Sequence, residues 1–130
     1  MELSVFDQGL SIADSHVAES PEEVRGQVRE YESGERDTFD LTITPLEGFS
    51  GDVMEAMAAI PYGETRTYGE LADELDTAAV AVGQACSRNP VPLVVPCHRV
   101  VGANGALCGY SADGGLELKE RLLQFEGALD

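Results

Sequence analysis

The stretch NPVPLVVPCHRVV, residues 89–101, constrains the fold more than any other part of this chain. Its prolines at 90, 92 and 96 each fix a backbone torsion and remove a hydrogen-bond donor, so no regular helix can cross the stretch. The apolar residues 93–95 lie between two prolines and predict a short buried strand that Pro96 ends. Cys97 and His98 follow directly. Because free cysteine is among the most buried residue types, the pair alone is more typical of a structural thiol than of a reactive one.

The charge of the chain is strongly negative. It carries 24 acidic residues against 8 basic ones, for a formal net charge of −16, and Lys119 is its only lysine. Proteins that bind polyanions usually present a basic patch, so this composition argues against such a partner. It does suit a protein from a halophile, because the Debye length falls to about 3 Å at 1 M salt and self-repulsion is then screened.

The acidic residues are absent from one window, residues 77–112, which contains Arg88 and Arg99. Two interpretations fit this window equally well. It is spared of acids for a functional reason, or it consists mostly of core segments and tight turns that exclude charge anyway.

Length and composition bound the class of protein. A chain of 130 residues with 43% hydrophobic residues can bury a core as one domain, or as one domain with a small appendage. No apolar run approaches the roughly 18 residues that cross a membrane, and the acidic start lacks the basic region of a secretory signal. We therefore expect a cytoplasmic protein with no membrane partner. The three cysteines form no CxxC pair and the chain has only two histidines, so we expect no disulfide, no metal and no cofactor.

Residues 1–45 predict a small region of mixed α and β structure. Residues 3–6 and 39–43 are expected strands, the second with alternating apolar residues. Between them, Ser20 and Glu23 form the pattern of a capping box around Pro21, and the helix that follows has an apolar face at positions 24, 28 and 31. Nothing in this region indicates chemistry.

From residue 49 the pattern changes to short helices. Ser50 is expected to cap the first, which ends before Pro61. Thr67 and Glu70 form a second capping-box pattern, and Thr77 is expected to cap a small-residue helix over residues 78–87. Two short helices with a tight connection are typical of a helix-turn-helix, although close packing of helices inside a protein explains small residues equally well.

The last elements are a turn and a helix. Asn104 and Gly105 predict a tight turn, and hence a small hairpin between residues 100–101 and residue 107. An amphipathic helix is expected from about residue 116 to residue 125, with its apolar face at positions 118, 122 and 125, and Gly127 ends it.

Three segments resemble the O6-alkylguanine-DNA alkyltransferases, also called methylated-DNA–protein-cysteine methyltransferases. They are IPYGETRTYGELA (residues 60–72), AVGQACSRNPVPLVVPCHRVVGANGALCGYS (81–111) and GGLELKERLLQFEG (114–127). The block PCHRV, with NPVP before it and GxxGxxxGY after it, is very specific for that family. The resemblance implies an α/β (α+β) fold, in which a reduced N-terminal αβ region, residues 1–45, precedes the catalytic and DNA-binding domain. That domain, residues 46–130, would be small and mostly helical, with a helix-turn-helix and short active-site strands.

The resemblance also implies a chemistry. Members of that family repair DNA by moving the alkyl group from O6 of guanine to a cysteine, which by resemblance would be Cys97 here. Such a step suits a soft thiolate, and because the thioether product has no good leaving group the protein reacts once. His98 would deprotonate Cys97 through a water, and Glu126 would orient the imidazole, as in a generalised catalytic triad.

The same resemblance assigns residues to the lesion. Tyr110 would donate a hydrogen bond to the guanine ring, and the backbone N–H of Ser111 would face O6. The carbonyl of Val100 would accept from the exocyclic amine, and Arg99 is expected among the substrate contacts. Asn89 would brace the hinge between the second helix of the helix-turn-helix and the cysteine segment.

The expected macromolecular partner is double-stranded DNA containing O6-alkylguanine, bound by a monomer. Tyr68 would press on the 3′ phosphate and rotate the base outward, because O6 is unreachable inside a stacked duplex. The other expected DNA contacts lie in or beside the second helix of the helix-turn-helix, at Val80, Ala81, Gln84 and Arg88. Two departures from the family pattern stand out: Val80 occupies the place of an inserted arginine, and the pocket loop from Tyr110 is two residues longer than usual.

Two other functions compete with this one. Alkyltransferase-like proteins bind alkylguanine without reacting and recruit other repair, but they lack the cysteine that this chain keeps. A thiol hydrolase would use the same three side chains on acyl substrates, but it needs an oxyanion hole that no motif indicates.

Overall fold

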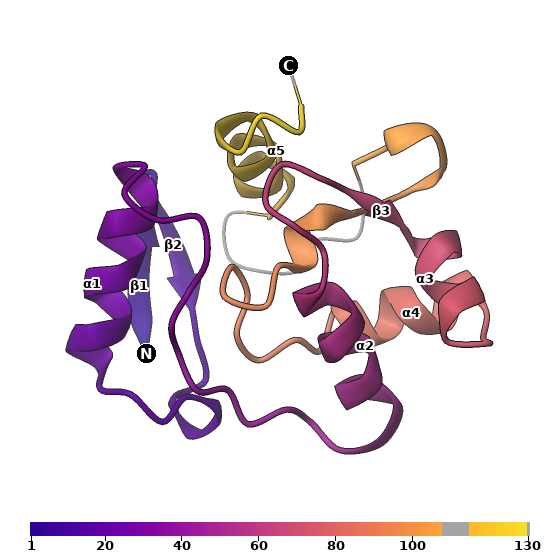
Figure 1. Ribbon diagram of the computed structural model, residues 1–130, viewed down its shortest axis with the longest axis horizontal. Coiled ribbons are helices and arrows are strands. Elements are labelled where there is room, and N and C mark those ends of the chain that lie inside the picture. The colour runs from indigo at the N-terminus through magenta and orange to yellow at the C-terminus, as the bar shows by residue number, and fades with distance from the viewer. Residues whose placement is uncertain (108–114, 130) are drawn as a thin grey trace.

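The computed structural model describes residues 1–107 and 115–129. In Figure 1 a hairpin and one long helix lie at one end, a group of short helices lies at the other, and α5 lies between them near the top. The elements in chain order are β1 (Glu2–Val5), β2 (Gln8–Ser11), η1 (Asp14–His16), α1 (Pro21–Glu32), α2 (Gly48–Ala58), β3 (Arg66–Thr67), α3 (Tyr68–Glu74), α4 (Ala79–Cys86), η2 (Cys97–Arg99), β4 (Val100–Val101), η3 (Ala103–Gly105) and α5 (Gly115–Phe125). No helix of the described residues is long and apolar enough to cross a membrane.

The N-terminal hairpin differs from the sequence prediction. β1 pairs with β2 in antiparallel register from Glu2–Ser11 to Val5–Gln8, so residues 6 and 7 alone make the turn. Both have positive φ, 49° at Phe6 and 64° at Asp7, which a two-residue hairpin turn of this hand requires. The expected strand over residues 39–43 is wrong, because the segment makes only an isolated bridge between Ile43 and Val17.

The helix α1 begins as expected. The hydroxyl of Ser20 accepts from the backbone N–H of Glu23 at 3.2 Å, which satisfies one of the free donors of the first turn. The Glu23 side chain accepts from Gln27 at 2.9 Å, so the observed cap is that of Ser20. The predicted inner face, at positions 24, 28 and 31, is buried.

Two other helix starts differ from the prediction. α2 begins at Gly48, with Glu47 at the cap position, so Ser50 lies inside the helix rather than capping it. Gly51 in its first turns allows the backbone to fold back closely, since a Cβ there would lie 2.0 Å from the carbonyl oxygen of Leu46. α4 begins one residue later than expected, with Ala78 and not Thr77 at the cap.

The helices α3 and α4 pack against each other with a short connection, as the helix-turn-helix interpretation expects. The second capping box is confirmed in both directions. Glu70 N–H donates to the Thr67 hydroxyl at 3.0 Å, and Thr67 N–H donates to the Glu70 carboxylate at 2.8 Å. The start of α3 is therefore fixed by four consecutive residues.

The segment before Cys97 is not a strand. Leu93 has a φ of 75°, and the N–H of Val95 donates to the carbonyl of Val91 at 2.9 Å, so the chain makes a compact turn. Leu93 and Val95 are still buried, as their apolar character requires. The segment enters a sheet only after Arg99, where β4 pairs in parallel with β3 and so lies beside the start of α3.

The turn at Asn104 and Gly105 is confirmed, with φ of 62° and 76°. Gly102 N–H donates to the carbonyl of Ala106 at 2.8 Å, but β4 takes β3 as its strand partner. α5 spans Gly115–Phe125, and Gly127 after it has a φ of 80°, which agrees with the predicted stop.

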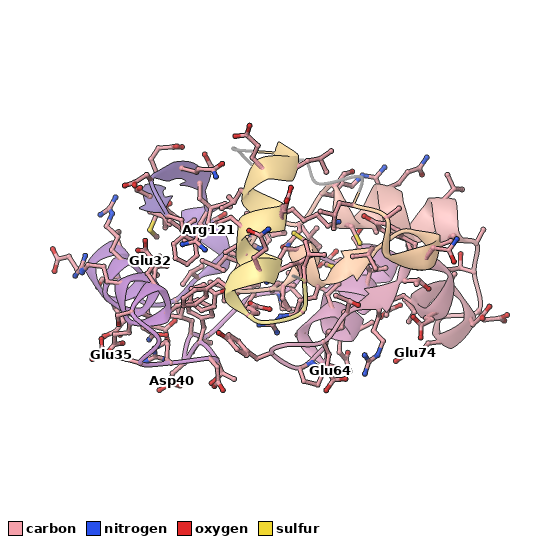
Figure 2. All side chains as sticks on the ribbon, turned by 90° about the horizontal axis from the view of Figure 1, so that it is seen from above. Glu32, Glu35, Asp40, Glu64, Glu74 and Arg121 are labelled. Carbon is pink, nitrogen blue, oxygen red and sulfur yellow. The ribbon has the colours of Figure 1, made fainter. Side chains whose placement is uncertain are left out.

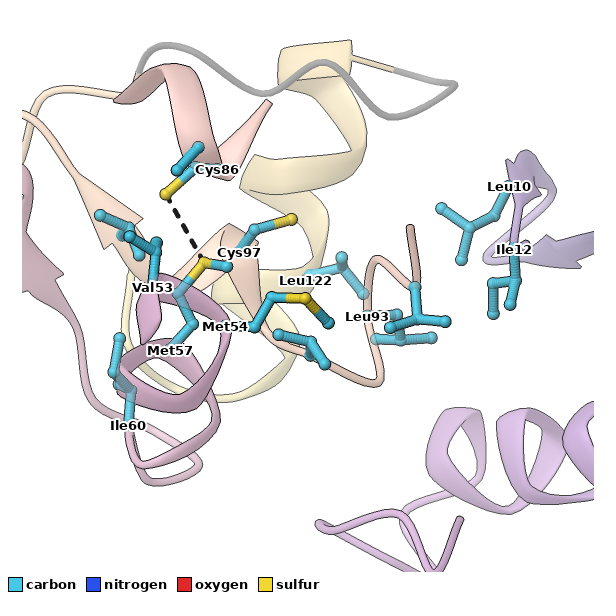
Figure 3. Close-up of a cluster of buried hydrophobic side chains, with 14 of the residues drawn as sticks. Leu10, Ile12, Val53, Met54, Met57, Ile60, Cys86, Leu93, Cys97 and Leu122 are labelled. Carbon is cyan, nitrogen blue, oxygen red and sulfur yellow. Dashed lines mark hydrogen bonds between the residues drawn. The ribbon is translucent and has the colours of Figure 1, made fainter. Parts of the chain in front are cut away.

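One continuous apolar core joins the two ends of the molecule. Figure 3 shows Leu10 and Ile12 of the hairpin region beside Leu93, with Met54 and Met57 of α2 and Leu122 of α5 beyond them. Cys97 belongs to this cluster, which includes residues of both halves of the chain.

Candidate active site

The candidate site is built from a single 3-10 turn and from the end of the last helix. Cys97, His98 and Arg99 are the three residues of η2, and Glu126 follows α5 directly. The turn is fixed by two backbone bonds, from Cys97 N–H to Val95 at 2.8 Å and from Arg99 N–H to Pro96 at 3.0 Å. All four side chains are buried, with His98 0% exposed and Cys97 7% exposed.

Glu126 is the hub of a buried hydrogen-bond network. Its Oε2 accepts from His98 Nε2 at 2.9 Å and from Arg99 Nη2 at 3.0 Å, and its Oε1 accepts from Arg99 Nε at 2.8 Å. The Tyr31 hydroxyl donates to Oε2 at 2.7 Å. Burial alone would raise the pKa of this carboxyl, but the bonds from His98, Arg99 and Tyr31 outweigh it and lower the pKa to about 2. The carboxylate is therefore ionised at neutral pH.

An ionised Glu126 fixes the tautomer of His98. Because a carboxylate only accepts, Nε2 of the imidazole must carry the proton, and Nδ1 keeps its lone pair. Nδ1 is buried and has no hydrogen-bond partner among the residues that the structure describes. Burial lowers the pKa of His98, with further lowering by the positive charges of Arg99 and Lys119, against the raising effect of Glu126. The result is a neutral imidazole with one nitrogen able to take a proton.

Arg99 does not take the place that the sequence predicted. We expected it among the substrate contacts, but its guanidinium is bidentate to Glu126 and donates through Nη1 to the carbonyl of Ile60 at 2.7 Å. It also lies over the ring of Tyr62, 5.8 Å from the centroid. These bonds fix Arg99 within the carboxylate network, as suits a planar fork of donors.

Two buried residues at the site, Lys119 and Tyr31, were not predicted from the sequence. Lys119, the only lysine, is fully buried, donates to the carbonyl of Val100 at 2.6 Å and lies 5.7 Å from the ring centroid of Tyr68. Its position seven residues before Glu126, on the same face of an otherwise apolar stripe, is the signal that could have found it. Tyr31 carried no such signal, because a tyrosine on the apolar face of a helix is ordinarily a core residue. The Val100 carbonyl, predicted to face the substrate amine, thus already accepts one hydrogen bond.

Asn89 lies where the expected brace should be. Its side-chain amide donates to the carbonyl of Val95 at 2.9 Å, and its side-chain oxygen accepts from Val91 N–H at 3.1 Å. These two bonds tie the end of α4 to the turn before Cys97. They also satisfy backbone groups that the prolines leave without regular partners.

The two described cysteines have different environments. Cys86 lies at the end of α4 and donates to the sulfur of Met57 at 3.5 Å (Figure 3). Burial raises the pKa of the Cys86 thiol to about 12, so it is held as a thiol. Cys97 directly precedes His98, whose imidazole can take a proton, in η2. Cys108, Tyr110 and Ser111 lie outside the described residues.

The predicted DNA contacts differ in their exposure to solvent. Val80 is 70% exposed, an unusual state for a valine, and Gln84 and Arg88 are exposed on the same helix or just after it. Ala81 and Tyr68 are half-buried. The window without acids therefore combines two situations, since α4 has an exposed face and no charged side chain whereas residues 91–101 are mostly buried.

The negative charge lies elsewhere on the surface. Figure 2 shows acidic side chains from one end of the molecule to the other, with Glu35 and Asp40 near α1 and Glu64 and Glu74 near the short helices. All four are exposed. Lys119 and Arg99 are buried, so little positive charge remains to offset them.

Comparison with known proteins gives consistent matches. Residues 48–128 match the family model described as 6-O-methylguanine DNA methyltransferase, DNA binding domain. The chain is 49% identical over 110 residues to the methylated-DNA–protein-cysteine methyltransferase of Methanosarcina acetivorans, covering 82% of this chain and 69% of that protein. The protein of the same name from Mycolicibacterium paratuberculosis is 43% identical, over 95% of this chain and 78% of that protein.

Comparison with solved structures agrees with the sequence matches. The crystal structure of Mycobacterium tuberculosis OGT in complex with DNA superposes with a TM-score of 0.76 at 43% identity, over 82% of this chain and 67% of that one. The chain thus spans about two thirds of the length of several of these relatives. It belongs to the methylated-DNA–protein-cysteine methyltransferase family, enzymes of DNA repair by direct alkyl transfer.

Proposed function

We propose that this chain repairs O6-alkylguanine in double-stranded DNA by moving the alkyl group once to the sulfur of Cys97. The observation that supports this most directly is the buried pair of His98 and Glu126, which leaves Nδ1 of His98 as a base next to Cys97 in the chain. A thiol becomes a good nucleophile only after it loses its proton, and the pair provides the acceptor.

The proposed reaction has two bond changes and two proton transfers. Cys97 gives its proton to Nδ1 of His98 through a water, and the ionised Glu126 stabilises the imidazolium through its bond to Nε2. The thiolate then attacks the alkyl carbon, a C–S bond forms, and the bond from that carbon to O6 breaks with its electrons on guanine. The guanine anion takes up a proton and remains in the DNA. The thioether on Cys97 has no leaving group, so each molecule reacts once.

Access to the base requires that it leave the stack. The proposed contacts are Tyr68 against the backbone, Val80 in the space that the base leaves, and Ala81, Gln84 and Arg88 along the groove. Tyr110, Ser111 and the Val100 carbonyl are the proposed contacts of the flipped base. The exposure of Val80 and the absence of charge on α4 support this placement.

The direct test is a mass measurement. The full chain is mixed with a duplex that carries one O6-methylguanine, and the intact protein and its peptides are then weighed. We expect a gain of one methylene on the peptide that contains Cys97, never more than once per molecule. Binding without any change in mass would identify a non-reacting lesion-binding protein, and repeated turnover with unmodified protein would contradict the single-use mechanism.

A further inference from the structure

Tyr31 reaches the buried centre from the N-terminal region, 95 residues before Glu126 in the chain. Its hydroxyl donates to Oε2 of Glu126 at 2.7 Å, and its side chain is 0% exposed. The same Oε2 accepts the Nε2–H of His98 at 2.9 Å. Tyr31 and His98 therefore share one acceptor atom.

We propose that Tyr31 is a positioning residue for alkyl transfer, which holds Oε2 of Glu126 in place and limits the basicity of His98. The inference rests on the proposed roles of Cys97 and His98. It makes the N-terminal region part of the reactive centre, although nothing in the sequence of that region indicates chemistry.

The hydrogen bond from Tyr31 weakens the interaction of Oε2 with His98. A carboxylate oxygen that accepts a hydrogen bond from a phenol stabilises a neighbouring imidazolium less than a free one does. The bond from Tyr31 therefore favours the neutral imidazole, which is the form that can take the proton of Cys97. Burial raises the pKa of Tyr31, and the charge of Glu126 raises it further, so the phenol keeps its proton and stays a donor.

Other charged or titratable groups face the pair from each neighbouring element. Arg99 of η2 and Lys119 of α5 lower the pKa of His98 through their positive charge. Tyr62, after α2, senses the charge of Glu126 and of Asp37, although burial is the main reason that its pKa is raised. Removing the Tyr31 hydroxyl leaves all of these unchanged, so its effect on His98 can be measured alone.

The position of the ring makes a clean substitution possible. The Tyr31 ring stacks on Phe39 with centroids 5.5 Å apart and lies 5.3 Å from Phe125. These contacts involve only the ring, so Tyr31→Phe keeps the packing and removes one donor. Tyr62→Phe is the matched control, because it removes the same group from a ring 6.3 Å away that lies outside the four bonds to Glu126.

The experiment follows the rate of reaction with free O6-benzylguanine from pH 5 to 9 at fixed ionic strength, together with the proton NMR shift of the His98 Nε2–H. Without the phenol, His98 should be more basic, and the acid limb of the rate profile should move to higher pH by about 0.5 to 1 unit, a three- to tenfold loss on that limb. Above pH 8 the rates should agree within about twofold, since the imidazole is neutral in both proteins. The Nε2–H should move downfield, because Glu126 accepts from it more strongly.

A second variant predicts the opposite sign. A chain with difluorotyrosine at position 31 has a stronger phenol donor, so its Nε2–H should move upfield. The inference is overturned if the Nε2–H stays in place in both variants, or if Tyr31→Phe slows the reaction equally at every pH, as a packing defect would. The NMR measurement needs no substrate, so a chain that fails to react at all contradicts the proposed function and not this inference.

Discussion

In the centre around Cys97 the charged groups are buried and paired, whereas the exposed helix α4 carries no charged side chain. Glu126, Arg99 and Lys119 each have at least one hydrogen-bond partner inside the protein. On α4, Val80 lies 70% exposed instead. The charges of the first region interact with fixed protein groups and are shielded from ions in solution. The second region has no side-chain charge for such ions to screen. Chemistry and DNA contact should therefore respond differently to mutation, pH and salt.

The largest effect on alkyl transfer should separate the two described cysteines. Cys97→Ala should abolish alkyl transfer while leaving binding to the lesion nearly intact, because the recognition surface is elsewhere. Cys86→Ala should leave transfer nearly unchanged, since that thiol has a pKa of about 12 and bonds to Met57. Transfer is measured by mass on the Cys97 peptide. An alkyl group found on Cys86 or Cys108 would show that Cys97 is not the reactive residue.

The next largest effect concerns the charge of Glu126. Glu126→Gln leaves the buried Arg99 without its anion, so we expect a loss of about 3 kcal/mol in the free energy of unfolding and a large loss of reaction rate. The pKa of Glu126 is lowered from 4.5 to about 2, so the native carboxylate stabilises the fold above pH 4.5 and that stability is lost as the pH falls towards 2.

Urea unfolding at several pH values tests this prediction. Between pH 7 and pH 3 the free energy of unfolding should fall more in the wild type than in Glu126→Gln. The variant lacks the carboxylate whose protonation causes the additional loss. Equal pH dependence of the two proteins would show that the carboxylate is not specially stabilised.

A smaller effect is expected at Val80. Flipping a base costs a few kcal/mol, and valine can only wedge into the gap, whereas an arginine can stack and donate hydrogen bonds there. Val80→Arg should speed repair of a duplex several-fold at low salt, about 1 kcal/mol. Reaction with free O6-benzylguanine, which needs no flipping, should hardly change. An equal response of both substrates, or of neither, would mean that Val80 does not occupy the gap.

The smallest effect should be that of salt. Each phosphate that a protein neutralises lowers the logarithm of affinity by about 0.9 per logarithm of salt concentration, and this surface has few bases with which to do so. We expect duplex repair to show a shallow salt slope and to persist in molar KCl, as the proposed halophilic character of the composition requires. The reaction with the free base should show almost no slope. A steep loss of duplex repair at moderate salt would contradict both expectations.

The success of the sequence predictions depended on distance along the chain. The capping box of α3 involves Thr67 and Glu70 only, and the stop of α5 involves Gly127 alone, so both could be predicted locally. The hairpin turn could not, because a bulky residue such as Phe6 does not ordinarily adopt positive φ. The turn over residues 93–95 has the composition of a strand, and only burial on several sides against other elements bends it.

Some residues of the candidate site could likewise be predicted from a local motif, and others could not. Cys97 and His98 are neighbours in a very specific motif, and the resemblance that it carries extends to Glu126. The contact of Tyr31 with Glu126 is one that no local pattern encodes, whereas the place of Lys119 on an otherwise apolar stripe was a signal that was not used. Arg99 was expected among the substrate contacts, and only the structure shows that its guanidinium donates to Glu126 and to the carbonyl of Ile60.

The buried network around Glu126 is also the last part of the site that a newly made molecule can assemble. Synthesis at about 5–20 residues per second separates Tyr31 and Glu126 by roughly 5–20 s, since 95 positions lie between their numbers. Cys97 and His98 are made within that interval and wait for a carboxylate that is added later. A nascent chain therefore carries an unassisted thiol, and the proposed assistance from Glu126 begins only when residue 126 has left the ribosome.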